Sequence, residues 1–96
     1  MKLGLVIKNI RKERTPQLNQ TDFAKLIGIT QAYLSQIESE LKTPSMKVLE
    51  TISNQFEIPI PIIFWLSITD EDISMDKRAY FSFIKPNVDS IINEFY

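Results

Sequence analysis

The chain has 96 residues, 44% of them hydrophobic and 24% charged, which allows one small domain with its own apolar core. It contains no cysteine and no histidine, so disulfide scaffolds, zinc sites with thiolate or imidazole ligands, and catalysis by either side chain are excluded. The formal net charge is −1, but residues 1–66 carry eight basic and six acidic side chains, whereas residues 67–96 carry three and six, so a mildly basic part precedes an acidic tail.

The first predicted helix begins close to the N-terminus. Leu3, Val6, Ile7 and Ile10 follow the i, i+3, i+4, i+7 spacing of an apolar helix face. We expect this helix to end near Arg14, because the next residue precedes a proline and is therefore disfavoured in the helical region.

Two short helices joined by a tight turn are expected next. Asn19 can cap the first of them, and Gly28 can end it in the left-handed conformation. Thr30 can cap the second, which is the third helix of the chain. The inward face of this third helix is expected to hold three apolar residues, Leu34, Ile37 and Leu41.

A fourth and a fifth helix follow in the region up to residue 66. Ser45 is expected to cap the fourth helix, whose apolar positions extend to Phe56. The fifth helix is expected to begin at Pro59 or Pro61, because proline is suited to the first turn of a helix.

The C-terminal part is expected to form two more helices after a charged linker at residues 69–74. Ser74 is a candidate cap for a sixth helix that runs to about Lys85. Pro86 is then expected to open a seventh helix, because proline disrupts a helix interior. The apolar positions of that segment have helical spacing: Val88, Ile91, Ile92 and Phe95.

The sequence shows neither a signal peptide nor a membrane span. Lys8 interrupts the apolar start of the chain, and no cleavage site with small residues follows. The longest apolar run, IPIPIIFWL, contains two prolines and is far shorter than the ~20 residues that cross a bilayer. We therefore expect a soluble protein located in the cytoplasm.

The outer face of the third predicted helix is short, uncharged and rich in amides, provided that Leu34 and Ile37 point inward. An α-helix fits the major groove of DNA, where glutamine can bond adenine, alanine can contact a thymine methyl group, and serine can bond several bases. Cations on other elements can hold the phosphates, so this helix needs no arginine. The face consists of Ala32, Ser35, Gln36 and Ser39, with Gln31 and Tyr33 at its flanks.

The segment QTDFAKLIGITQAYLSQIESE, followed by TPSMKVLETISNQFEIP, resembles the helix-turn-helix domain of the phage repressor/Cro-like (XRE) transcription regulators. The resemblance covers about residues 5–66. It implies an all-α protein with a five-helix lambda-repressor-like DNA-binding domain at residues 1–67. Residues 68–96 would then form an acidic linker and a short C-terminal helical extension, a candidate dimerisation arm.

The resemblance also implies roles for individual residues. Base contacts are expected from five of them, Gln31, Ala32, Tyr33, Ser35 and Gln36. Phosphate contacts are expected from four others, Gln20, Thr30, Ser39 and Lys42. Gln20 is also expected to brace Gln31, and Arg11 to form a structural pair with Glu38. The chain departs from the family at Glu40, where glycine or asparagine is frequent.

The fifth predicted helix is too apolar for a short helix with one buried face. Either the C-terminal helices cover it, which would enlarge the core of one chain, or a second subunit does. The residues expected at such a dimer interface are Ile60, Ile62, Phe64 and Trp65.

We therefore expect a sequence-specific regulator, in the first place a repressor, that binds a two-fold symmetric operator in double-stranded DNA as a homodimer. The alternative is an antitoxin-like or antirepressor-like protein-interaction module with little DNA affinity, which would bind its partner through the acidic surface at Glu38 and Glu40 and through the acidic tail. An enzyme is not expected, because the sequence offers no catalytic constellation. No cofactor or metal is expected either, since the acidic residues at 70–76 lack the EF-hand spacing.

Overall fold

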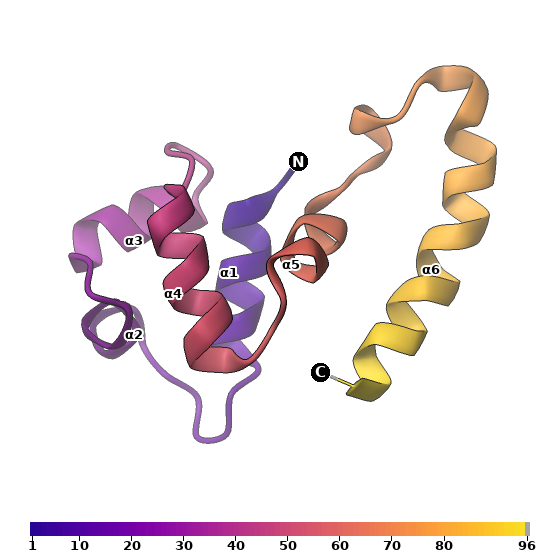
Figure 1. The fold of residues 1–96 in the computed structure, drawn as a ribbon. Helices are drawn as coiled ribbons and strands as arrows, with labels where there is room; N and C mark the ends of the chain where they lie inside the picture. The colour runs from indigo at the N-terminus through magenta and orange to yellow at the C-terminus, as the bar shows by residue number, and fades with distance from the viewer. Residues whose placement is uncertain (96) are drawn as a thin grey trace.

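The computed structural model describes residues 1–95, and every regular element in that range is a helix. Five helices pack together (Figure 1): α1 (Leu3–Lys12), α2 (Gln20–Ile27), α3 (Gln31–Glu38), α4 (Met46–Phe56) and α5 (Ile60–Ser67). Two short 3₁₀ helices, η1 (Asp70–Asp72) and η2 (Met75–Lys77), lead into the long helix α6 (Arg78–Phe95). The expected all-α architecture with a C-terminal helical extension is thus confirmed.

The apolar core lies where the first five helices meet. α1 packs against α3 and α5, while α2 packs against α3 and α4. Phe23 of α2 stacks on Phe56 of α4 with the ring centroids 5.3 Å apart, and the Arg14 guanidinium lies 4.6 Å from the Phe56 centroid. The fully buried side chains of this core include Ile7, Phe23, Leu34, Ile37, Leu49, Ile52 and Ile63. Each such side chain contributes about 1.5–3 kcal/mol, so this cluster is the main source of stability.

The N-terminal end of α1 crosses closely over the C-terminal end of α3. Gly4 is buried at the crossing, and a Cβ atom there would collide with the carbonyl oxygen of Ile37. The Glu40 carboxylate accepts a hydrogen bond of 2.8 Å from the backbone N–H of Leu5. Because Lys2 offers α1 no side-chain cap, the acidic residue after α3 satisfies a free amide in the first turn of α1.

Three consecutive helices, α2, α3 and α4, end in the same way. Each is followed by a left-handed residue: Gly28 at φ 76°, Glu40 at φ 64° and Glu57 at φ 55°. The next N–H in each case bonds the carbonyl group five residues earlier, joining Ile29 to Ala24, Leu41 to Gln36 and Ile58 to Ser53. This is the Schellman motif, in which the left-handed residue is usually glycine and sometimes asparagine.

The third helix is shorter than predicted, and the inward position expected for Leu41 is wrong. α3 ends at Glu38, and Leu41 is 77% exposed. The left-handed backbone at Glu40 turns the chain away before Leu41 can reach the core. α1 is also shorter than predicted, because it ends at Lys12 and not near Arg14.

The C-terminal segment forms one helix, so the expected division at Pro86 is wrong. Proline inside a helix removes one N–H donor and costs about 3 kcal/mol. Here Pro86 is exposed, and the Asn87 side chain donates to the Phe83 carbonyl group at 2.7 Å. A continuous helix also keeps Phe81 and Asp89 on one face, since they are eight residues apart.

That face of α6 packs against Trp65 of α5, on the side of the molecule away from α2 and α3 (Figure 1). The indole N–H donates to Asp89 at 2.9 Å, and the Phe81 ring centroid lies 6.2 Å from that of Trp65. The Lys85 ammonium group lies 3.1 Å from Asp89 and 5.3 Å from the Trp65 ring centroid. Within residues 1–95, no helix has the length and apolar character needed to cross a bilayer.

We predict different outcomes for glycine substitutions at two of the left-handed positions. Glu57→Gly should raise the free energy of unfolding by about 0.5–1 kcal/mol, because glycine adopts this conformation without the steric cost of Cβ. Glu40→Gly relieves the same cost but removes the carboxylate at the first turn of α1, which contributes about 1 kcal/mol, so no net gain is expected. Urea denaturation measures both changes. Equal stabilisation by the two substitutions would mean that the Glu40–Leu5 hydrogen bond contributes nothing.

Candidate nucleic-acid interface

α2 and α3 are joined by a tight turn and begin with the caps that were predicted from the sequence. The Asn19 side chain accepts from the N–H of Asp22 at 2.8 Å, and the Thr30 hydroxyl group accepts from the N–H of Tyr33 at 3.1 Å. Leu34 and Ile37 are completely buried, which directs the opposite side of α3 outward. The two helices therefore have the arrangement of a helix-turn-helix unit.

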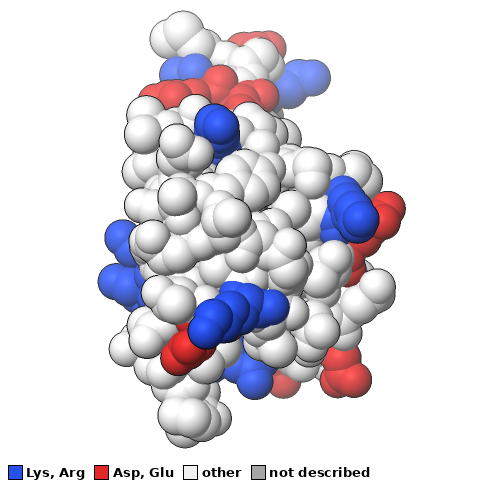
Figure 2. All heavy atoms as spheres, turned by 90° about the vertical axis from the view of Figure 1, so that its left-hand side faces the viewer, with Lys and Arg blue, Asp and Glu red and all other residues white. Residues whose placement is uncertain are grey.

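The outward side of α3 is polar but uncharged. Gln31, Ala32 and Ser39 are exposed, whereas Ser35 and Gln36 are half-buried. Tyr33 packs against the edge of the apolar core. Figure 2 shows the side of the molecule on which α2 and α3 lie as a mostly uncharged surface, with basic groups and some carboxylates around it.

A buried ion pair joins α1 to α3 behind this surface. Arg11 donates from Nε and Nη2 to the two carboxylate oxygens of Glu38, both at 2.8 Å, and from Nη1 to the Leu18 carbonyl group at 3.0 Å. The two paired side chains are only 9% and 3% exposed. Burial by itself would raise the pKa of Glu38, but hydrogen bonds from Arg11 and Gln20, together with the charges of Arg11 and Lys8, hold the pKa below its ordinary value.

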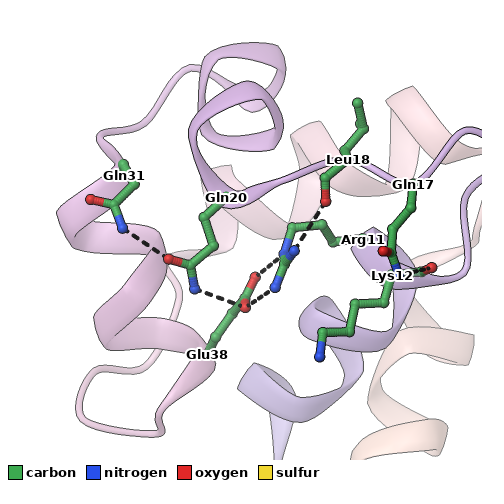
Figure 3. Close-up of polar contacts among 7 residues, drawn as sticks. All are labelled: Arg11, Lys12, Gln17, Leu18, Gln20, Gln31 and Glu38. Carbon is green, nitrogen blue, oxygen red and sulfur yellow. Dashed lines mark hydrogen bonds and ion pairs between the residues drawn. The ribbon is translucent and has the colours of Figure 1, made fainter.

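Two glutamine amides extend this pair to the outer surface (Figure 3). Gln20 Nε2 donates to Glu38 Oε1 at 3.1 Å, and Gln31 Nε2 donates to Gln20 Oε1 at 2.8 Å. A carboxylate can only accept, so Gln20 must turn its amino group to Glu38 and its carbonyl oxygen to Gln31. Gln31 must then act as the donor, which leaves its own carbonyl oxygen and one N–H for a ligand. The charge of Glu38 thus sets the hydrogen-bonding edge that Gln31 presents.

Two lysines of α1, Lys8 and Lys12, line an open cleft beside this network. The cleft is also lined by Gln20, by Ser35 of α3 and by Ser39, which follows α3. Within residues 1–95, neither lysine takes part in a salt bridge. The sequence alone did not distinguish Lys8 and Lys12 from the other basic residues as candidates for phosphate binding. The crossing of α1 over α3 places these two lysines next to the outer face of α3.

The remaining residues expected at phosphates have varied surroundings. The Thr30 hydroxyl group is occupied as the cap of α3, and the Ser39 hydroxyl group donates to the Gln36 carbonyl group at 3.2 Å. Lys42 is exposed in the segment after α3. The acidic residues of the linker form no metal-binding group of three or more side chains within the described part of the chain.

Removing one partner of the buried pair should be strongly destabilising. Glu38→Ala leaves the Arg11 charge buried without its carboxylate, and we expect the free energy of unfolding to fall by about 3–5 kcal/mol. The double substitution Arg11→Met with Glu38→Leu removes both charges and should recover most of that loss. Thermal or urea denaturation measures the stability of the native chain, of Glu38→Ala and of the double variant. A double variant as unstable as Glu38→Ala would show that the loss does not come from leaving the buried charge of Arg11 unpaired.

The same pair should make stability depend on pH. The pKa of Glu38 is lower in the folded chain than in the unfolded chain, where it is ~4.3, so its contribution is complete above that value. The contribution is lost as the pH falls through the folded-state pKa. Between neutral pH and about pH 3, the native chain should lose more stability than the Arg11→Met, Glu38→Leu variant. Identical losses in both chains would exclude Glu38 as a source of the acid dependence.

The region that contains the helix-turn-helix unit is similar to known proteins. The helix-turn-helix family model matches residues 7–63. Over 62 residues the chain is 39% identical to the ImmF control region 10 kDa protein of Bacillus phage phi105, which covers 65% of this chain and 67% of that protein. Over 82 residues it is 29% identical to the immunity repressor protein of Bacillus phage phi105, which covers 85% of this chain and 53% of that protein.

The chain thus spans about two thirds of the first relative and about half of the second. No solved structure matches it. The family match covers more than half of the chain and includes the whole of α2, the turn and α3. The chain therefore belongs to the helix-turn-helix family of phage repressor/Cro-like (XRE) DNA-binding regulators.

Proposed function

We propose that this protein is a cytoplasmic repressor that reads a two-fold symmetric operator in double-stranded DNA as a homodimer. The observation that carries the proposal is the hydrogen-bonded chain from Arg11 through Glu38 and Gln20 to Gln31, because it orients an amide on an otherwise uncharged helix face. One relative carries the name immunity repressor protein, which supports repression over activation. A protein bound at a promoter would exclude the polymerase.

Base reading in this proposal comes from the outward side of α3. The free N–H and carbonyl oxygen of Gln31 match the N7 acceptor and the N6 donor of adenine in the major groove. Ala32 would contact a thymine methyl group, while Gln36 and Ser35, which are half-buried, would reach bases only where the helix enters the groove deeply. Tyr33, at the edge of the core, would make a secondary contact.

Phosphate binding in this proposal comes from residues next to α3 and at its ends. Lys8 and Lys12 would neutralise the DNA backbone next to the cleft that they line, and Gln20 would contribute the N-terminal end of α2. Lys42, which is exposed after α3, would add a further contact, as would the polar groups of Thr30 and Ser39 at the two ends of α3. These contacts position the protein on the duplex and leave sequence reading to α3.

Two subunits are part of the proposal because one subunit offers few cations to a polyanion. A two-fold dimer would place both copies of α3 in major grooves about 34 Å apart, or a multiple of that distance, on one face of the duplex. The subunits would pair through α5 and the helix that follows it. On α5, Ile60, Ile62 and Phe64 are half-buried, and Trp65 is engaged by α6.

Substitution of the reading amides should weaken cognate binding selectively. Gln31→Ala and Gln36→Ala are each expected to lose roughly 1–3 kcal/mol on the operator and little on random DNA. The operator is obtained by selecting bound duplexes from a random pool, and binding is then measured by fluorescence anisotropy. An equal loss on random DNA would contradict base reading by these side chains.

Gln20→Ala tests the hydrogen-bonded chain itself. It should reduce the discrimination between bases at the position read by Gln31, because the Gln31 amide would no longer have a fixed orientation. Gln17→Ala is the matched control, since Gln17 donates to the Lys12 carbonyl group and touches neither Glu38 nor Gln31. Unchanged base preference in Gln20→Ala would remove the chain from the mechanism.

Removal of the cleft lysines should weaken binding to every duplex alike. Lys8→Ala and Lys12→Ala are each expected to lower the slope of log K against log salt by about 1, on operator and random DNA. Lys2→Ala, before α1 and in a cleft lined by residues of α1, α5 and α6, serves as the control and should leave the slope unchanged. If the native chain shows no salt-sensitive binding to random duplex, the protein-interaction module is the better description.

A further inference from the structure

α6 has a second face that nothing in residues 1–95 covers. One face packs toward α5 through Phe81, Lys85, Asp89 and neighbouring residues. The adjacent face, which we call the α6 stripe, carries five large apolar side chains that are between 47% and 76% exposed: Tyr80, Phe83, Ile84, Ile91 and Phe95. At 100° per residue these five positions point to one side of the helix.

The exposed apolar area of the α6 stripe is close to the area that one partner buries in a protein–protein interface. Residues 80–95 extend roughly 22 Å along the helix, at a rise of about 1.5 Å per residue. Three aromatic and two isoleucine side chains at these exposures present on the order of 600 Å² of apolar surface. Monomers rarely expose patches of more than a few hundred Å², and a stable interface buries ~800 Å² on each partner.

The order of residues in the α6 stripe is nearly the same in both chain directions. From the N-terminal end it runs from Tyr80 and Phe83 to Ile84, and from the C-terminal end it runs from Phe95 to Ile91, with Asn87 between the two isoleucines. A two-fold interface must be self-complementary, since each surface meets its own copy. An antiparallel pair of α6 helices centred near Asn87 would place Tyr80 against Phe95 and Ile84 against Ile91.

The charges at the two ends of α6 also favour an antiparallel pair. Asp76, Lys77 and Arg78 lie at the N-terminal end of the helix and together carry one net positive charge, and Glu94 lies at the C-terminal end. An antiparallel arrangement brings the basic end of one helix next to the acidic end of the other and aligns the helix dipoles favourably. A parallel arrangement would set like charges side by side.

We propose that the α6 stripe is a homodimer interface on which α6 of a second copy packs in the antiparallel direction. This inference rests on the proposed function, for which it supplies the subunit contact, and it places that contact on α6 alone. Trp65 and its partners on α6 are then intramolecular contacts that hold the helix in place. Because α6 lies away from α2 and α3, pairing through it leaves both outward faces of α3 free for DNA (Figure 1).

Sedimentation equilibrium of the full chain, without DNA, tests the proposal. The native chain should have the mass of a dimer at roughly 100 µM. Ile84→Lys and Ile91→Glu should each weaken dimerisation roughly 100-fold, because each buries an unpaired charge in the apolar interface. The double variant Ile84→Lys with Ile91→Glu should dimerise again, since each lysine would face a glutamate of the other copy. Ser82→Lys, on the opposite side of α6, should leave the mass unchanged.

The outcomes separate this inference from the proposed function. A native chain that stays monomeric, or a dimer that Ile84→Lys and Ile91→Glu leave intact, would overturn the α6 interface, and so would failure of the double variant to recover. Circular dichroism on each variant confirms that it remains helical. A monomer that still binds duplex DNA would leave base reading standing, whereas a stripe-dependent dimer without any DNA binding would overturn the proposed function alone.

Discussion

The buried ion pair between Arg11 and Glu38 is the constraint on which the rest of the DNA-binding unit depends. Each charge is almost completely removed from water, so each requires the other. Satisfying both therefore fixes the position of α1 relative to α3. The same position brings Gly4 against the Ile37 carbonyl group and places Lys8 and Lys12 beside the outer face of α3.

The Glu38 carboxylate of this pair determines how the amide of Gln31 is oriented at the surface, and it does so through hydrogen bonds alone. Glu38 can only accept, and each glutamine that follows has one accepting and one donating end, so the orientation of Gln20 determines that of Gln31. A buried carboxylate thereby controls which hydrogen-bonding groups an exposed amide presents at the surface. Arg11 neutralises the charge of Glu38, but the carboxylate still determines the direction of the hydrogen bonds.

The acidic residues near the end of α3 are compatible with a DNA-facing surface because both serve internal contacts. Glu38 is paired with Arg11, and Glu40 accepts from the first turn of α1. Neither is an unengaged acidic group of the kind that a protein-interaction module would use. At the other end of the chain, α6 is held to α5 by one aromatic and polar cluster around Trp65 and keeps an apolar face open. The extension thus adds a surface and not only a larger core.

The sequence by itself determined the features that depend on near neighbours. The apolar periodicity, the caps at Asn19, Thr30 and Ser45, and the left-handed Gly28 all follow from contacts within a few residues, and they identify the helix-turn-helix unit. Periodicity also predicted the burial of Leu34 and Ile37, since it requires only that one face of α3 pack inward.

Only the tertiary structure decided the features that join distant segments. Glu40 lies 35 residues from the amide that it caps, so no local pattern could explain its charge or the early end of α3 that exposes Leu41. Pro86 looked like a helix start because proline disfavours a helix interior, but contacts with Trp65 on both sides of it keep α6 continuous. Local propensities are worth a few kcal/mol at most, and packing between segments can outweigh them.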